Sequence, residues 1–438
     1  MDGNAIIIIH NYFTMEFSVT KSNGSLVAPC EPTPSVPLDL SRIDRLPVLR
    51  CNARTLHVFE PIGPHGAAWS TIREALSKAL VPYYPLAGRL SSDGSIIDCT
   101  GDGVWFVESS ANCSLRVVDY FKDVTTIPFD DLLPSHPSED QGVDPLVLMQ
   151  ITEFEGDGFV MGLTFCHAIC DGLGAAQFLN AIGEFARDLN PLTVTPLWHR
   201  NFLPPPQLTT PATLPPAIFT LPDYHLVQAN IDIPFNDHIT RLKQEFMKVS
   251  LKHCSNFEIV AAILWRNRTQ SMNLGSENRT MKLVFFANCR QLVAPPLPKG
   301  FYGNCFFPVT ITASSETLAG ASIVDVIRMI QEAKARLPEE FSDWAKEDGG
   351  RKKEDPFAPP LGYDTLFLSE WGRLGFNEVD YGNGPPVHVI PMQGSPVIPV
   401  AIVGSLPRPD KGLRLMTWCV QDHHLQPFLD SIISIFPR

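Results

Sequence analysis

The architecture of this chain can be read outward from one stretch, GFVMGLTFCHAICDGLGAAQFLNAIGEFAR, which runs from Gly158 to Arg187. Its first nine residues, Gly158 to Cys166, are almost continuously apolar, which predicts a strand buried on both faces. After a tight turn, apolar residues recur every three or four positions and predict an amphipathic helix from Gly174 to Leu189. His167 follows the strand directly, where a covered sheet opens into a crevice and reactive groups are commonly presented.

The same two patterns recur along the 438 residues. Helical spacing appears at 69–80, 257–272 and 324–337, and strand-like runs appear at 281–289, 305–313 and 413–420. Several of these strands are apolar on both faces, so the sheets should be covered by helices. The pattern predicts an α/β or α+β pair of sandwiched sheets. Residues 199–223 hold seven prolines and are typical of an extended interdomain crossover.

Composition excludes several classes of protein. With 34 Lys and Arg against 47 Asp and Glu, the net charge is −13, which gives no electrostatic basis for binding nucleic acid or an anionic membrane. No apolar run approaches the ~20 residues of a transmembrane helix. The opening AIIIIH is too short for a signal peptide. The ten cysteines are scattered without a C-x-x-C pair, so we expect a reduced, cytoplasmic compartment.

His167 has a chemical and two plainer interpretations. A neutral imidazole in a crevice can take a proton from a hydroxyl or an amine, because its unperturbed pKa is near 6.5. Asp171 is within reach of the same turn and can anchor it by pairing with a cation. A lone histidine at a strand end can also be purely structural. Cys166, His167, Cys170 and Asp171 could suggest metal ligands, but no further paired ligands appear, so no metal is expected.

The motif HAICDG, His167 to Gly172, resembles the H-x-x-x-D-G motif of the plant BAHD acyl-CoA-dependent acyltransferases. A lone H-x-x-x-D would be weak, but five further blocks follow in the order and spacing of that family. They are LVAPCEPTPSVPLDLSRID (26–44), ALVPYYPLAGRL (79–90), FEIVAAILWRNRTQ (257–270), NCRQLVAPPLPKGFYGN (288–304) and GFNEVDYGNG (375–384).

The resemblance implies a fold of two domains similar to chloramphenicol acetyltransferase, each a mixed β-sheet flanked by helices. A solvent channel should separate them, with acyl-CoA entering from one face and the acceptor from the other. The expected boundaries are 1–198 for the domain that carries His167, 199–223 for the crossover loop, and 224–438 for the second domain. A return of the segment around 376–400 to the first sheet is an option.

The resemblance also implies roles for individual residues. His167 should act as the general base, while Asp171 pairs with Arg290 and, with Gly172 and Asp380, supports the catalytic loop. The family's second motif, D-F-G-W-G, is DYGNG here, from Asp380 to Gly384. Its Asn383 either donates a hydrogen bond to the oxyanion in place of the tryptophan or belongs to a loop that is only structural.

For coenzyme A, the candidate contacts are Lys252, Ser255, Asn256 and Gly382. Ser255 and Asn256 precede a predicted helix whose N-terminus could hold a phosphate, whereas Lys252 could equally be a solvated surface residue. Coenzyme A is an anion, so this acidic chain needs a local basic entrance.

The expected function is transfer of an acyl group from acyl-CoA to a small plant metabolite, with a hydroxyl acceptor favoured over an amine. The PPLPKGFYGN block looks most like the branch that acts on alcohols and on taxane-like or aromatic acceptors. Acyl-CoA would be a co-substrate and no cofactor would be permanently bound; a monomer is expected. The alternative is a non-catalytic relative that keeps the fold as a binding partner, for example in lipid elongation.

Overall fold

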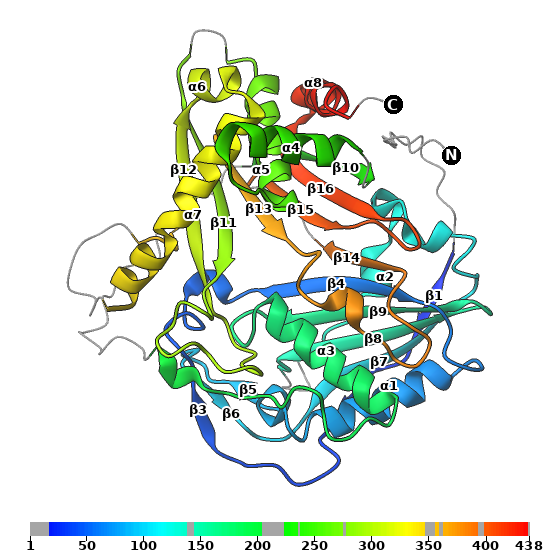
Figure 1. The fold of residues 1–438 in the computed structure, drawn as a ribbon. Helices are drawn as coiled ribbons and strands as arrows, with labels where there is room; N and C mark the ends of the chain where they lie inside the picture. The colour runs from blue at the N-terminus through cyan, green and yellow to red at the C-terminus, as the bar shows by residue number, and fades with distance from the viewer. Residues whose placement is uncertain are drawn as a thin grey trace.

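The structure is a computed structural model that describes residues 17–137, 144–203, 223–234, 237–274, 277–346, 355–358, 362–392 and 398–436. Most of the expected crossover, residues 204–222, lies outside the described residues. The described chain forms two large mixed sheets, each with helices packed on it, and one small sheet (Figure 1). The predicted fold class is confirmed.

The first sheet has seven strands in the order β1-β7-β8-β9-β4-β14, with β2 also paired to β7. Strands β7 and β8 run parallel and the other neighbours antiparallel. The bounds are β1 Val19–Lys21, β2 Ser25–Val27, β4 Asn52–Phe59, β7 Val104–Ala111, β8 Val147–Phe154, β9 Gly158–Cys166 and β14 His388–Met392.

Helices α1 (Ala67–Ala79) and α3 (Gly172–Ala186) pack together against this sheet and share one apolar core with it. Both match the predicted helices. A short helix, α2 (Phe129–Leu132), contacts β9 as well. The small sheet, in the order β3-β6-β5, consists of Pro37–Asp39, Ile96–Asp98 and Arg89–Leu90.

The second sheet has six strands in the order β10-β16-β15-β13-β11-β12. Strand β13 runs parallel to both of its neighbours, β11 and β15. The bounds are β10 Leu226–Pro234, β11 Thr280–Asn288, β12 Phe306–Ser314, β13 Thr365–Glu370, β15 Val400–Ser405 and β16 Gly412–Gln421. The predicted strands at 281–289, 305–313 and 413–420 correspond to β11, β12 and β16.

The helices of the second half are α4 (Asp237–Ser250), α5 (Asn256–Ser271), α6 (Ser315–Gly320), α7 (Ile323–Lys346) and α8 (Asp422–Ile433). Helix α5 is the centre of this core, since it contacts α4, α6, α7 and α8 and buries residues on every side. Single 3₁₀ turns lie at 47–49, 84–87, 119–121, 124–126, 200–202 and 376–378.

The two sheets are joined through β14, which comes from the second half of the chain but pairs antiparallel with β4. A separate apolar cluster fills the space between the sheets; its buried members include Leu56, Val58, Val160, Ile390, Ile402 and Met416. Because this contact is apolar and includes a shared strand, the two halves form one packed body. None of the helices in the described ranges is long and apolar enough to cross a membrane.

Two glycines allow the close packing that places the turn after β9. A Cβ on Gly162 of β9 would lie 2.1 Å from the carbonyl oxygen of Leu132, and one on Gly174 of α3 would lie 1.8 Å from that of Tyr302. The second contact is across the molecule, because Tyr302 belongs to the loop before β12. The turn at residues 167–171 is therefore pressed between the two halves of the chain.

Candidate active site

His167 is placed by its main chain at the C-terminal end of β9. Its N–H donates to the carbonyl oxygen of Cys51 at 2.9 Å, next to the β4–β9 pairing of Asn52 with Cys166. The imidazole is partly exposed, and its centroid lies 6.1 Å from that of Phe165 and 6.4 Å from that of Phe306. Nδ1 is buried and has no partner among the residues that the structure describes.

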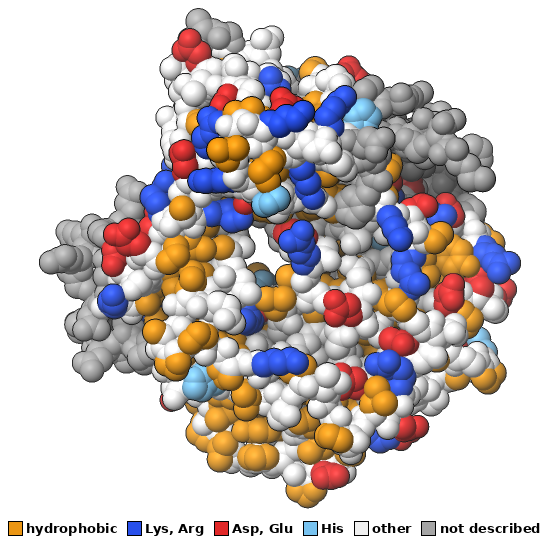
Figure 2. Space-filling model, viewed as in Figure 1, with side chains coloured by type: hydrophobic (Ala, Val, Ile, Leu, Met, Phe, Trp, Pro, Cys, Tyr) orange, Lys and Arg blue, Asp and Glu red, His pale blue; other side chains and the backbone are white. Residues whose placement is uncertain are grey.

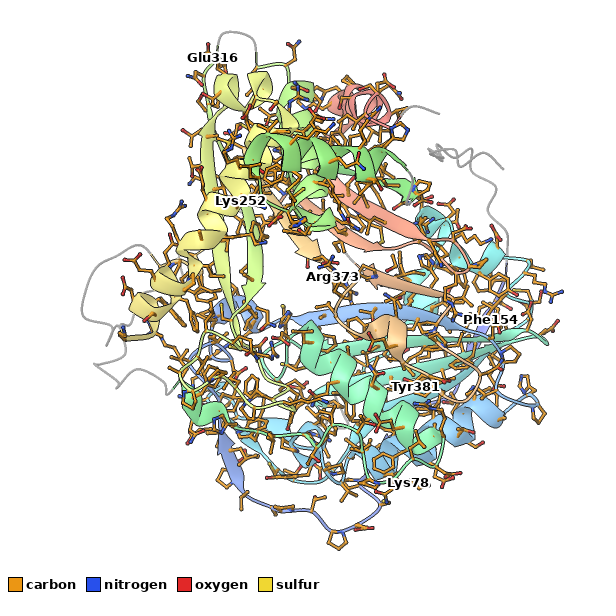
Figure 3. The ribbon with its side chains drawn as sticks, in the orientation of Figure 1. Lys78, Phe154, Lys252, Glu316, Arg373 and Tyr381 are labelled. Carbon is orange, nitrogen blue, oxygen red and sulfur yellow. The ribbon has the colours of Figure 1, made fainter. Side chains whose placement is uncertain are left out.

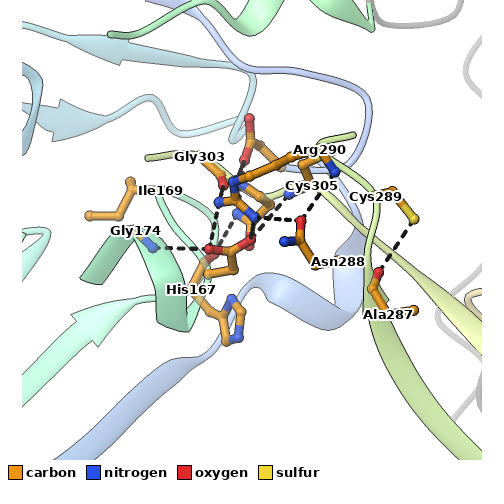
Figure 4. A network of polar contacts seen from close by, with 12 residues as sticks. His167, Ile169, Gly174, Ala287, Asn288, Cys289, Arg290, Gly303 and Cys305 are labelled. Atoms are coloured by element: carbon orange, nitrogen blue, oxygen red, sulfur yellow. Dashed lines mark hydrogen bonds and ion pairs between the residues drawn. The ribbon is translucent and has the colours of Figure 1, made fainter. Parts of the chain in front are cut away.

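Asp171 holds the other end of the turn. Its carboxylate caps α3 by accepting from the N–H of Gly174 at 3.0 Å. Both of its oxygens also accept from Arg290, with two N···O distances of 2.8 Å. Asp171 is 8% exposed, so this two-bond pair is almost enclosed. The structure brings His167, Asp171 and Arg290 together, as Figure 4 shows for the network around Arg290.

Arg290 connects this turn to the second half of the chain. Its guanidinium also donates to the carbonyl oxygen of Gly303 at 2.7 Å and lies 3.3 Å from Oδ1 of Asn288. Burial lowers the pKa of Arg290, but the charge of Asp171, its hydrogen bonds and the neighbouring thiols of Cys305 and Cys170 together raise it above its usual value. The guanidinium is thus a fixed cation. Gly172 lies at the same turn, where a Cβ would come within 2.6 Å of Leu374.

A second buried network beside the turn was not predicted from the sequence. Asp44 and Arg200 form an ion pair at 3.4 Å, and both side chains are almost fully buried. Asn304 donates to Asp44 and to the main-chain oxygen of His167. Arg200 donates to the carbonyl oxygen of Ile169 at 2.6 Å. Asp44 and Asn304 stand inside the sequence blocks quoted above, which is the one signal that could have singled them out.

The other ionisable groups packed nearest to the turn are neutral. Burial raises the pKa values of the thiols of Cys170 and Cys305 and of the Tyr302 hydroxyl. All ten cysteines are free thiols. Over the described ranges, no group of three or more His, Cys, Asp or Glu side chains is placed to hold a metal ion. The arrangement is therefore a partly exposed imidazole on a turn that two buried ion pairs hold.

The DYGNG loop lies at the opposite end of α3 from His167. The carboxylate of Asp380 accepts from the N–H groups of Gly382 and Gly384, both at 2.8 Å, and faces Arg187 at 3.4 Å. The main chain of Asp380 packs on Gly183, where a Cβ would lie 2.5 Å from its oxygen. Gly183 is about 18 Å along the helix axis from Asp171.

This position bears on two expectations. The Nδ2 group of Asn383 donates to the carbonyl oxygen of Pro61 at 2.8 Å, so it is tied to a loop of the first half and does not reach His167. The geometry favours the second alternative, a loop with a structural role. Gly382 is in the same loop, next to Tyr381, far from Lys252 in the other half (Figure 3). The structure does not bring Gly382 together with the other expected coenzyme A contacts.

The remaining coenzyme A candidates share one end of α5. Ser255 caps the helix by accepting from the N–H of Glu258 at 3.2 Å, and Glu258 accepts from the N–H of Ser255 at 2.9 Å. The carboxylate of Glu258 also accepts from Lys334 at 2.5 Å. Asn256 is the first helical residue, with its Oδ1 buried and unbonded within the described chain. Lys252 is exposed just before them.

Basic side chains gather on one face of the molecule. Figure 2 shows a hollow near the centre of the face, between the two halves of the molecule, with Lys and Arg side chains gathered above it. Arg373 lies between the two sheets in Figure 3, and Lys252 lies higher, on the second half. The net charge of −13 therefore coexists with a basic region on this face.

The chain matches known proteins over most of its length. The sequence model of the Transferase family matches residues 17–426. Acyl transferase 4 of Oryza sativa subsp. japonica is 41% identical over 95% of this chain and 99% of its own length. The myricetin 3-O-glucosyl 1,2-rhamnoside 6'-O-caffeoyltransferase AT2 of Crocosmia x crocosmiiflora is 37% identical over 95% and 99%. The 3'-N-debenzoyl-2'-deoxytaxol N-benzoyltransferase of Taxus canadensis is 34% identical over 94% and 95%.

Solved structures share the fold at lower identity. Vinorine synthase superposes with a TM-score of 0.68 at 21% identity, covering 95% of this chain and 98% of its own. F. sporotrichioides TRI101, solved in complex with coenzyme A and T-2, gives 0.69 at 14% identity, covering 90% and 97%. The chain is thus similar over nearly its whole length to plant acyltransferases. This chain belongs to the Transferase family and is an acyltransferase of the plant BAHD type.

Proposed function

We propose that this acyltransferase takes its acyl group from acyl-CoA and transfers it to a hydroxyl group of a small plant metabolite, with His167 as the general base. The observation that carries the proposal is the imidazole itself. It is the partly exposed base on a turn that the Asp171–Arg290 pair fixes at 2.8 Å, between the two sheets. A base held in this way can meet two substrates in one hollow.

The proposed reaction is a direct transfer. The imidazole takes the proton of the acceptor hydroxyl while the oxygen attacks the thioester carbonyl carbon, which gives a tetrahedral oxyanion. That intermediate collapses as the carbon–sulfur bond breaks, and the imidazolium returns the proton to the leaving thiolate. The products are an ester and free coenzyme A. Base catalysis of this kind contributes about 10²–10⁴-fold, and holding both substrates together contributes much of the rest.

The substrate classes are supported by the relatives. One structural neighbour was solved with coenzyme A, and the basic region over the hollow in Figure 2 suits a phosphorylated donor. We place the phosphates near Lys252 and the N-terminus of α5 at Ser255 and Asn256. We propose a hydroxyl acceptor because the relative from Crocosmia x crocosmiiflora is an O-caffeoyltransferase. An amine is the second candidate, because the relative from Taxus canadensis is an N-benzoyltransferase.

We also propose domain boundaries for this enzyme. Residues 1–198 form the domain with His167, 199–223 the crossover, and 224–438 the second domain. The segment that crosses back is β14, because it pairs with β4 of the first sheet. Asp171, Gly172, Arg290 and Asp380 are proposed to support the structure, the first three at the catalytic turn and Asp380 at the far end of α3.

The test compares the wild-type protein with His167→Ala. Benzoyl-CoA, acetyl-CoA or caffeoyl-CoA is incubated with a panel of aliphatic, benzylic and glycoside alcohols, and release of the coenzyme A thiol is followed. We expect kcat to fall by about 10²–10⁴-fold in His167→Ala, since the base is lost. His65→Ala, a change at a mostly exposed histidine near α1, is the control and should keep the wild-type rate.

A folded wild-type protein that releases no thiol from any donor would support the non-catalytic alternative. A His167→Ala variant with the wild-type rate would leave the enzyme in place but remove His167 as its base. The two results are distinct.

A further inference from the structure

Asn304 is a buried amide that contacts both the turn of His167 and the Asp44–Arg200 ion pair. Its Nδ2 donates to the main-chain oxygen of His167 at 2.9 Å and to Oδ1 of Asp44 at 2.8 Å. Its own N–H donates to the same Asp44 oxygen at 3.2 Å. Both Asn304 and Asp44 are fully buried. The Asn304 side chain therefore links the main-chain oxygen of His167 to the carboxylate of Asp44, which lies near the N-terminus of the chain.

The orientation of this amide is determined by its partners. A carbonyl oxygen and a carboxylate oxygen both accept hydrogen bonds, so only the NH₂ end of Asn304 can face them. Asp44 is itself held, because its other oxygen accepts from the N–H of Ser41 at 3.0 Å and from the Ser41 hydroxyl at 2.6 Å. The amide cannot flip without placing its oxygen against two acceptors.

Arg200 completes the cluster on the next part of the turn. Its Nε lies 3.4 Å from Asp44, and its NH2 group donates to the carbonyl oxygen of Ile169 at 2.6 Å. The guanidinium lies 4.2 Å from the ring centroid of Trp198, which fixes its plane. A Cβ on Gly303 would lie 1.0 Å from this guanidinium, so the residue before Asn304 must be glycine here.

Each part of the turn is thus held by a different group: His167 by Asn304, Ile169 by Arg200 and Asp171 by Arg290. We propose that Asn304, oriented by Asp44 and Arg200, is a positioning residue that fixes the direction of the His167 side chain through its main chain. This rests on the proposed function of His167 as the base. If the carbonyl of residue 167 is free to tilt, the imidazole moves with it, and a misplacement of about 1 Å can cost about 10²-fold in rate.

The experiment compares Asn304→Ala with Asn180→Ala. Asn180 is the control, because its Nδ2 also donates to two oxygens, the main-chain oxygens of Ala176 at 2.8 Å and Gly375 at 3.1 Å, away from the turn. With benzoyl-CoA and the best alcohol of the panel, Asn304→Ala should lower kcat by about 10–100-fold and leave the KM for benzoyl-CoA within about threefold. Asn180→Ala should leave kcat within about threefold.

Two further measurements separate positioning from a general loss of stability. Asn304→Ser keeps one donor and should recover part of the lost kcat. Hydrogen–deuterium exchange of peptides spanning residues 163–172 should be faster in Asn304→Ala than in Asn180→Ala. In a His167→Ala background, adding Asn304→Ala should change the residual rate by less than about twofold, because the group that it positions is gone.

The outcomes are separable. Equal kcat in Asn304→Ala and Asn180→Ala would overturn the positioning role while the function of His167 stands. A loss of the same size in the His167→Ala background would also overturn it, since the effect would then not act through the imidazole. A wild-type protein without turnover would overturn the proposed function and this proposal with it.

Discussion

The groups that fix the turn at residues 167–171 contact its main chain and its capping carboxylate, and the imidazole of His167 stays partly exposed. Asn304 and Arg200 bind carbonyl oxygens, and Arg290 binds Asp171. The proposed base is thus held through its main chain, and its own ring forms none of these bonds.

A first prediction concerns Asp171→Asn. The change removes the charge that compensates Arg290, and both side chains are almost enclosed, with 11% and 12% exposure. Leaving one buried charge unpaired costs about 3–5 kcal/mol. We expect the urea midpoint to fall accordingly. The double variant Asp171→Asn with Arg290→Gln should regain part of this loss, and since Asn also caps helices, no recovery would mean that an unpaired Arg290 is not the cause.

The sequence predicted some of these residues and missed others for a physical reason. His167 and Asp171 are four positions apart, and the resemblance adds Arg290. Asn304 and Asp44 are 260 positions apart along the chain, and their contact depends on how the two halves pack. For Asn383 the sequence left two roles open. A motif gives an order along the chain, but the length of α3 separates this loop from the base.

The N-terminus of α5 is capped by Ser255 and is also part of the proposed coenzyme A site. Ser255→Ala removes the cap and should lower the free energy of unfolding by about 1 kcal/mol. Ser314→Ala is the matched control, because Ser314 caps α6 by accepting from the N–H of Thr317 at 3.1 Å. A rise of KM for acyl-CoA in Ser255→Ala alone supports the phosphate site; equal KM values in both variants contradict it.

The paired strands β4 and β14 contain two buried histidines that make stability sensitive to acid. Burial lowers the pKa of His57 in β4 to about 3, and burial with the charge of Arg414 lowers the pKa of His388 in β14 well below its usual value. These two paired strands hold neutral imidazoles that protonate in the unfolded chain below about pH 6.5. Stability is therefore complete above pH 6.5 and falls as the pH drops toward 3.

The corresponding prediction is for His57→Gln. Each buried neutral histidine contributes a slope of about 1.4 kcal/mol per pH unit in this window. Between pH 6 and pH 4, the free energy of unfolding of the variant should fall with a slope that is smaller by this amount than the slope of the wild-type protein. Urea unfolding at several pH values measures both slopes. His225→Gln, at a side chain that is 86% exposed, should keep the wild-type slope. An unchanged slope in His57→Gln would contradict the assignment.

Regular elements were predictable where the apolar pattern was long. β9, α3, α5 and β16 follow from their spacing, because burial on one or both faces imposes a period. β14 was not assigned as a strand: HVIPM is five residues long and contains Pro391. Proline is tolerated there because β14 is the edge of its sheet. The sequence indicates such a strand only weakly, and its partner, β4, is set by tertiary packing.

For the molecule as a whole, Arg414 is a polar link between the two sheets, in addition to the Arg290–Asp171 pair. From β16 it makes two bonds of 2.7 Å to Asp232 of β10, one of 2.6 Å to the carbonyl oxygen of Lys122, and lies 3.3 Å from Nε2 of His388. Its partners therefore come from both sheets. The Asp232 side chain is 18% exposed and would lose its partner if Arg414 were replaced.

We therefore predict that Arg414→Met destabilises the whole protein by about 3–5 kcal/mol. Because the halves share a strand and an apolar cluster, urea unfolding followed by tryptophan fluorescence and by circular dichroism should still give coincident transitions. Asp232→Leu added to Arg414→Met should restore part of the stability. Two separate transitions in the single variant would show that the halves are independent folding units.

The late position of β14 in the sequence also determines when the first sheet can be completed during synthesis. The ribosome completes β9 at residue 166, but the strand that covers the edge of β4 emerges roughly 225 residues later. At about 5–20 residues per second, that edge waits roughly 10–45 s. An open strand edge can pair with another chain, so β14 closes this site of aggregation only at the end of the interval.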